Sequence, residues 1–168
     1  MIEFRPITDA DVPQLQEWLR RPHVAEWWRN EDASRYLAQP HEHFVILFDG
    51  RPVGMIQSYL VAEYPEWQAI VGDDPGLAGI DLFVGEEELL GTGFGPQVLT
   101  AFADEIAFVD PHVLACVATV EEGNRRSWRA FEKAGFRHVR DVEEEDLPHR
   151  LMRLDRPLRS VRGPVADP

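Results

Sequence analysis

Apolar positions in the first quarter of the chain follow two different spacings. Residues 2–6 alternate apolar and polar side chains, which predicts a short strand. Thr8 or Asp9 can then cap a helix that extends to about Arg21, where Pro22 ends it. The apolar residues of this helix recur every three or four positions and define its inner face: Val12, Leu15, Trp18 and Leu19. The chain therefore opens with a strand followed by an amphipathic helix.

The same spacings predict the remaining elements. Helical segments are expected at residues 23–28, 31–38, 95–108 and 124–134. Strands are expected at residues 44–48, 53–61, 77–84, 113–119, 136–142 and 150–154. Residues 63–76 are rich in Pro, Gly and acid, and we expect a loop there. The resulting order, β-α-α-β-β-β-α-β-α-β-β, predicts an α/β fold of the α+β type, with helices on both faces of a mixed sheet.

Length and composition indicate one globular domain. The 168 residues carry ordinary shares of apolar and charged side chains. We assign residues 1–156 to the domain and residues 157–168, rich in Pro, Gly and Arg, to a loose C-terminal tail. The single cysteine, Cys116, excludes an intramolecular disulfide and suits a reducing compartment. With no signal-like start and no apolar run long enough for a bilayer, a cytoplasmic protein is expected, as a monomer or homodimer.

The net charge of −13 constrains the partners. Such an acidic surface repels phosphate backbones and anionic lipids, so neither nucleic-acid binding nor membrane binding is expected. It attracts cations, although acidic surfaces also serve solubility alone. The net charge favours a cationic partner over solubility alone only if some of the acids lie at a binding site.

A glycine-rich loop carries the first chemical signal. Residues 91–95 read Gly-Thr-Gly-Phe-Gly and connect the strand at 77–84 to the next helix. Backbone N–H groups of such a loop, together with the helix N-terminus, can bind a pyrophosphate. No strand-borne acid follows at the spacing of a dinucleotide site, and no Gly-Lys-Ser/Thr follows as in a P-loop. The loop indicates a phosphate site of another kind, or an ordinary turn.

The second signal is the run Asn124 to Phe136, which reads Asn-Arg-Arg-Ser-Trp-Arg-Ala-Phe-Glu-Lys-Ala-Gly-Phe. By itself it describes an amphipathic helix that Asn124 caps and Gly135 ends. Together with the glycine loop upstream, the run resembles the Gcn5-related N-acetyltransferase (GNAT) superfamily. The resemblance implies that acetyl-CoA, or coenzyme A, binds at the loop and at Asn124.

Within that superfamily, residues 2–155 resemble the aminoglycoside 6′-N-acetyltransferases. Three stretches carry the likeness: His23-Val-Ala-Glu-Trp-Trp28, Gly54-Met-Ile-Gln-Ser-Tyr59 and Asp74-Pro-Gly-Leu-Ala-Gly-Ile-Asp81. The resemblance implies transfer of an acetyl group to a primary amine of a small polycationic acceptor such as an aminoglycoside. It implies direct attack on the thioester, with no acyl-enzyme.

The resemblance also implies roles for individual residues. Asp81 would be the general base, since a carboxylate beside the acceptor can hold the ammonium group and take its proton. The residues implied for cofactor binding are Leu82, Phe83, Val84, Leu90, Gly91, Thr92, Gly93, Phe94, Gly95, Asn124 and Phe131. The residues implied for substrate binding are Glu26, Trp28, Tyr59, Asp74, Asp81 and Glu121. Of the two adjacent tryptophans, we expect Trp27 to face the core.

Two departures from the family pattern stand out. Phe131 occupies the place of a tyrosine that can protonate the leaving thiolate. The acid usual after the fifth strand is absent from residues 119–124, where Glu121 can substitute. Alternatives therefore remain: acylation of a siderophore-type lysine derivative or a peptide, or a catalytically weak coenzyme A-binding protein.

Other polar residues receive structural interpretations. The six histidines lack metal-ligand spacing, and no metal is expected. The acidic run at residues 143–146 is interpreted as a solvated hairpin turn that could also help to attract a cation. Cys116 is expected in the core.

Overall fold

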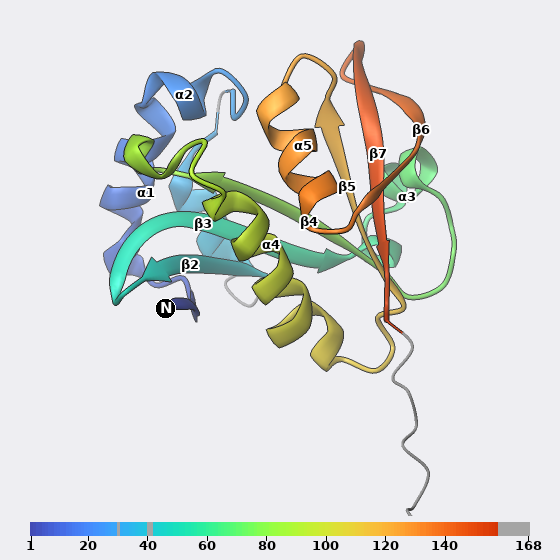
Figure 1. Cartoon of the computed structure of the whole chain (residues 1–168), viewed down its shortest axis with the longest axis horizontal. Coiled ribbons are helices and arrows are strands. Elements are labelled where there is room, and N and C mark those ends of the chain that lie inside the picture. The colour runs from blue at the N-terminus through green and yellow to red at the C-terminus, as the bar shows by residue number, and fades with distance from the viewer. Residues whose placement is uncertain (30, 40–41, 158–168) are drawn as a thin grey trace, which may run out of the picture.

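Seven strands form one mixed sheet in the order β1-β2-β3-β4-β5-β7-β6 (Figure 1). The computed structural model describes residues 1–29, 31–39 and 42–157. The strands are β1 (Ile2–Pro6), β2 (His43–Phe48), β3 (Arg51–Leu60), β4 (Leu77–Val84), β5 (Ala115–Glu121), β6 (Arg137–Glu144) and β7 (Leu147–Asp155). The α-helices are α1 (Val12–Arg20), α2 (Pro22–Ala25), α3 (Pro65–Val71), α4 (Phe94–Glu105) and α5 (Arg125–Lys133). Single 3-10 turns or short 3-10 helices lie at Asp9–Asp11, Ala33–Ala38, Val61–Glu63, Glu87–Leu89 and Ala107–Val109.

The predicted mixed-sheet architecture is confirmed. All seven expected strands form, and each overlaps its predicted range. The turn between β2 and β3 occupies Asp49 and Gly50, both with positive φ angles. Gly135 ends α5 with φ of +93°, in the left-handed region that glycine adopts without strain.

Helix α3 corrects the prediction of an unstructured loop at residues 63–76. Pro65 occupies the first turn, where its missing N–H costs nothing, and Glu66 adds an acid that favours a helix N-terminus. Gly72, with φ of +114°, follows the last helical residue. The segment is only seven residues long, and its Pro and Gly act as boundaries of a helix rather than as marks of a loop.

The helices cover both faces of the sheet, because neighbouring residues on each strand point in opposite directions. Ile56 of β3 lies in the cluster formed with α4 and α5, whereas the adjacent Met55 lies in the cluster formed with α1. A third, smaller apolar cluster packs residues around α3 against β5 and β7. Cys116 is fully buried in the first cluster, as expected, and burial raises the pKa of its thiol to about 12.

Strands β4 and β5 separate after a short stretch of pairing. They run parallel, and only Leu77, Ala78 and Gly79 of β4 have register partners on β5. Beyond Gly79, β4 stays paired with β3 up to Val84 but has no partner on its other edge within the described part of the chain. The sheet is therefore open between β4 and β5, and this opening positions the site.

The domain boundary stays a prediction. Apart from Pro157, the expected tail at residues 157–168 lies outside the described residues. Over the residues that the structure describes, no helix has the length and apolar character to cross a membrane.

Candidate active site

The open edge of β4 presents backbone groups to the gap between β4 and β5. At one end, the carbonyl of Gly76 accepts hydrogen bonds from β5-side amides, including that of Leu114 at 2.7 Å. At the other end, the N–H of Gly85 donates to the carbonyl of Val53 in β3. Because N–H and C=O groups alternate sides along a strand, the N–H groups of Leu82 and Val84 point into the gap. Leu82 and Val84 are among the residues that the resemblance to the family implies for cofactor binding.

A cavity of about 320 Å³ extends from this edge along α4 and α5. Among the residues that line it are most of those implied for cofactor binding: Leu82, Phe83, Val84, Leu90, Gly91, Gly93, Gly95, Asn124 and Phe131. Gly91 and Gly93 have φ angles of +76° and +88°, which a side chain would strain. The loop therefore turns its backbone toward the cavity directly before α4.

Two predicted cofactor residues do not line this cavity. Thr92 is exposed, and its hydroxyl donates to the carbonyl of Leu89 at 2.7 Å. Phe94 is buried in the core, where its ring lies edge-on to that of Phe48 with 5.1 Å between the ring centroids. The side chains of Thr92 and Phe94 thus shape the loop from outside the cavity.

Helix α5 supplies positive charge that the sequence analysis missed. Arg126, Arg129 and Lys133 recur at helical spacing and all line the same cavity. They lie on the helix that flanks the glycine loop, so cationic side chains and loop amides face one space. The signal was present in the sequence as basic residues three and four positions apart, on the face next to the apolar one.

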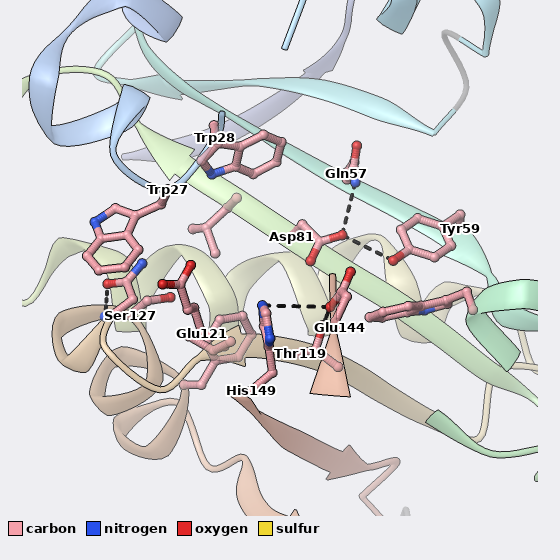
Figure 2. A pocket seen from close by; sticks show the side chains of 15 residues that line it. Trp27, Trp28, Gln57, Tyr59, Asp81, Thr119, Glu121, Ser127, Glu144 and His149 are labelled. Carbon is pink, nitrogen blue, oxygen red and sulfur yellow. Dashed lines mark hydrogen bonds and ion pairs between the residues drawn. The ribbon is translucent and has the colours of Figure 1, made fainter. Parts of the chain in front are cut away.

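A second cavity, of about 370 Å³, lies beyond the same gap (Figure 2). Asp81 stands on its wall, half-buried on β4. Its Oδ2 accepts hydrogen bonds from Gln57 Nε2 at 2.9 Å and from the Tyr59 hydroxyl at 3.1 Å. Since Gln57 is the register partner of Asp81 on β3, the sheet itself fixes this contact.

The surroundings of Asp81 hold its proton affinity above the ordinary level. Burial raises the pKa of Asp81 from 3.8, and the two hydrogen bonds from Gln57 and Tyr59 offset only part of that rise. The nearby charge of Glu144 raises it further. A carboxylate with a raised pKa is a better proton acceptor than a solvated one, as general-base chemistry requires.

Aromatic side chains form one wall of the second cavity. Trp28 packs edge-on against Phe83 with 5.2 Å between ring centroids, and both Trp27 and Trp28 line the two cavities. The expectation that Trp27 faces the core is therefore wrong. Tyr59 lies across Gly79, where a Cβ atom would come within 2.4 Å of the tyrosine ring. Gly79 thus leaves the space that Tyr59 needs to reach Asp81.

The structure brings Glu121 to this cavity but not Glu26 or Asp74. Glu121 lines the cavity and pairs with Arg29, whose guanidinium nitrogens lie 2.8 and 3.4 Å from its carboxylate oxygens. Glu26 is exposed and outside the described lining. Asp74 is also outside it, exposed and paired with Arg153 at 2.5 Å. Of the predicted substrate set, Trp28, Tyr59, Asp81 and Glu121 share one space.

Further polar groups line the cavity, and of these only Glu144, from the acidic run at residues 143–146, had been considered as a residue that could help to attract a cation. Thr119 donates its hydroxyl hydrogen to Glu144 Oε2 at 2.6 Å. His149 Nε2 lies 3.8 Å from the same oxygen, and its Nδ1 lies 3.0 Å from the Leu147 carbonyl. Trp67 of α3 also lines the cavity. These residues come from β5, the β6–β7 hairpin and the unpredicted helix.

Phe131 and Asn124 lie where the two cavities meet, since each lines both. Asn124 caps α5, with its side-chain oxygen accepting from the Ser127 N–H at 3.2 Å. Phe131 packs edge-on against Phe136 at 5.0 Å between ring centroids. A phenyl ring at this junction has no proton to donate.

The fold and these joined cavities are those of an acetyltransferase. Residues 8–144 match the family model described as an acetyltransferase (GNAT) domain, and the chain belongs to that family. It is 31% identical, over 88% of its length and 79% of the relative's, to aminoglycoside N(6′)-acetyltransferase type 1 of Klebsiella pneumoniae. It is 28% identical to N(6)-hydroxylysine O-acetyltransferase of Escherichia coli, over 92% of this chain and 51% of that protein.

A solved structure gives the same result in three dimensions. The crystal structure of aminoglycoside acetyltransferase AAC(6′)-Ib in complex with coenzyme A and kanamycin superposes with a TM-score of 0.82 and 30% identity. The match covers 93% of this chain and 95% of that one. The predicted fold and the predicted superfamily are therefore both confirmed.

The first cavity fits coenzyme A by its own chemistry. The N–H groups of Leu82 and Val84 can pair with the amides of a pantetheine arm that continues the sheet. The loop backbone and the α4 N-terminus suit a pyrophosphate, and the three cations of α5 suit phosphate charge. Among the described residues, no group of acids, histidines and cysteines is arranged to hold a metal ion.

Proposed function

We propose that this protein is an acetyl-CoA-dependent N-acetyltransferase whose acceptor is a primary amine of a small polycationic molecule of the aminoglycoside kind. The observation that supports the proposal most directly is the junction of two cavities at β4. One cavity offers backbone amides and cations, and the other offers carboxylates and aromatic rings. An anionic donor and a cationic acceptor can therefore approach one another from opposite sides of Leu82.

Acetyl-CoA supplies the acetyl thioester to be transferred. The N–H groups of Leu82 and Val84 fix the donor against β4 and can stabilise negative charge that develops on the carbonyl oxygen. Asp81 holds the acceptor ammonium group and takes its proton, directly or through a water molecule. The amine nitrogen then bonds to the carbonyl carbon as the carbon–sulfur bond breaks, the thiolate leaves, and the nitrogen loses its remaining extra proton to water.

The leaving thiolate receives no proton from residue 131. Since Phe131 has no donor, a water molecule protonates the sulfur or the thiolate departs unprotonated, as the low pKa of thiols permits. The proposed acceptor class rests on the aromatic wall and on the carboxylates of Asp81, Glu121 and Glu144, which suit ammonium groups on a ring.

Thiol release from acetyl-CoA tests the function. Purified protein is mixed with acetyl-CoA and, in separate reactions, with kanamycin, spermidine, N(6)-hydroxylysine and a lysine-containing peptide. We expect release with kanamycin at the highest kcat/KM. Faster turnover of N(6)-hydroxylysine or the peptide would assign the protein to the alternative acceptors. Binding of coenzyme A with no release from any acceptor would indicate a non-catalytic binding protein.

A further inference from the structure

One hydroxyl group lies where the donor and acceptor cavities meet. Six of the residues that the structure describes line both cavities: Trp27, Trp28, Leu82, Asn124, Ser127 and Phe131. Among these six, Ser127 is the only one that carries a hydroxyl. Figure 2 shows Ser127 on the wall of the acceptor cavity, at the same end as Trp27 and Glu121. None of the steps assigned to Asp81 and to the edge of β4 uses this hydroxyl.

The Ser127 hydroxyl is free to donate a hydrogen bond. Within the described residues Ser127 Oγ makes no hydrogen bond, and only the backbone N–H of Ser127 is engaged, by the Asn124 side chain at 3.2 Å. The hydroxyls of Tyr59 and Thr119, which also line the acceptor cavity, both donate to carboxylates. Ser127 Oγ is not among the enclosed polar atoms that lack a partner, so part of its surface is open to the cavity.

The position of Ser127 on α5 places its hydroxyl where a donor is missing. Ser127 lies four residues before Phe131, so the two side chains lie one above the other on the same face of the helix. Side chains on a helix lean toward its N-terminus, and a ring at position 131 therefore covers the turn that holds residue 127. A tyrosine hydroxyl at position 131 would extend toward Ser127. Phenylalanine leaves that end of the ring without a donor, and the serine supplies one.

We infer that Ser127 is a further catalytic residue, whose hydroxyl donates a hydrogen bond to the sulfur of coenzyme A as the carbon–sulfur bond breaks. This role rests on the proposed function and belongs to the same site. The amine nitrogen bonds to the carbonyl carbon, the electron pair of the carbon–sulfur bond passes to sulfur, and the Ser127 O–H group stabilises the resulting thiolate. The proton stays on Ser127 Oγ, because an aliphatic hydroxyl is a much weaker acid than a thiol, and water protonates the sulfur after release.

Three substitutions isolate the hydroxyl. Ser127→Ala removes it and leaves the Asn124 cap in place, because that cap bonds the backbone N–H. Ser127→Thr is the conservative replacement and keeps a hydroxyl at the same position. Thr100→Ala is the matched control: Thr100 is exposed on α4, donates to the Pro96 carbonyl at 3.0 Å and lies outside both cavity linings.

Single-turnover mixing of the acetyl-CoA complex with kanamycin measures the rate of acetyl transfer. For Ser127→Ala we expect that rate to fall about tenfold or more, the usual effect of losing a hydrogen bond to a charged group, with both KM values changed by less than about threefold. Ser127→Thr and Thr100→Ala should stay within about threefold of the wild type. The loss should shrink in a Phe131→Tyr background, since tyrosine then donates to the same sulfur. No loss from the wild type, or an equal loss in both backgrounds, would refute the inference.

Binding of coenzyme A tests the contact without any transfer. The ultraviolet absorbance of the thiolate gives the pKa of the bound thiol, and desulfo-coenzyme A, which lacks the sulfur, is the blank. A hydroxyl that donates to the sulfur favours the thiolate, so we expect a lower thiol pKa in the wild type and Ser127→Thr than in Ser127→Ala.

That difference in thiol pKa would support the contact of Ser127 with the sulfur even if no acceptor were acetylated and the proposed function failed. Equal thiol pKa values in the wild type and Ser127→Ala would refute the inference. Acetylation of kanamycin by the wild type would in that case leave the proposed function standing.

Discussion

Replacement of Asp81 by asparagine separates the charge of this side chain from its position. The donors that fix it, Gln57 Nε2 and the Tyr59 hydroxyl, lie 2.9 and 3.1 Å from Oδ2, and an amide oxygen can accept from either. The variant therefore keeps its place on the cavity wall and loses the ability to take a proton. General-base catalysis contributes about 10²- to 10⁴-fold, which corresponds to about 3–5 kcal/mol in the activation free energy. We expect kcat/KM of Asp81→Asn to fall by that factor.

The same substitution should stabilise the protein at neutral pH. The folded-state pKa of Asp81 is raised, so its contribution to stability is fully present below the ordinary value of 3.8 and is lost as pH rises through the raised value. At pH 7 the wild type therefore contains a carboxylate whose ionisation opposes folding, and asparagine removes that cost. We expect a higher Tm for Asp81→Asn at pH 7, with a smaller difference as the pH falls and the wild-type side chain becomes protonated.

The assays are thiol release for kcat/KM and thermal unfolding for Tm, each across a pH series. Asp104→Asn is the control, because Asp104 is an exposed acid of α4 outside both cavity linings. The coenzyme A-induced rise in Tm should be nearly the same in all three proteins. A kcat/KM of Asp81→Asn within about threefold of wild type would refute the assignment of the base. A lower Tm at pH 7 would refute the electrostatic account.

Four other variants test further parts of the molecule. Arg126→Gln should weaken coenzyme A binding, and less so at high salt, whereas Arg125→Gln on the same helix but outside the cavity should not; titration calorimetry compares them. Arg29→Ala should lower KM for a polycation by releasing Glu121, and an unchanged or higher KM would contradict this. Phe131→Tyr should raise kcat by supplying a thiolate proton donor, without tightening coenzyme A binding. Asp11→Ala should cost about 1–2 kcal/mol at pH 7 in denaturant unfolding, since Arg5 and Thr8 hold the pKa of Asp11 at about 2; that stability is lost as pH falls from 3.8 through about 2.

The parts of the fold that depend on local patterns could be predicted from the sequence. Strands with regular alternation and helices with clear caps formed where expected, since propensity, capping and burial agree in those segments. Helix α3 could not be recognised with the same ease, because seven residues give less than two full turns of periodicity. The glycine loop could be located because it lies between a regular strand and a regular helix, whereas Asp81 was singled out through the resemblance to the family.

Contacts across the cavity depend on the path of the chain and could not be predicted. Arg29 and Glu121 are 92 positions apart, and no local pattern links them. Glu144 belongs to a run of four acids, and the member that faces the cavity is decided by the pairing of β6 with β7. The register shifts between His138 and Arg140, and one additional residue reverses the direction of every later side chain. Alternation read from residue 137 therefore gives no reliable face for residue 144.

Because only three residues of β4 pair with β5, binding of coenzyme A in the gap should affect how firmly the two parts of the sheet are held together. Between Ile80 and Val84 one edge of β4 has no hydrogen-bonded strand among the residues that the structure describes, so a pantetheine arm lying there would act as a short additional strand. Amides on this edge should then exchange with deuterium readily in the free protein and slowly in the complex, while those that pair β4 with β3 are protected in both. The gap between β4 and β5 would therefore be bridged only while acetyl-CoA or coenzyme A is bound. The edge of β4 would lose this support each time coenzyme A leaves.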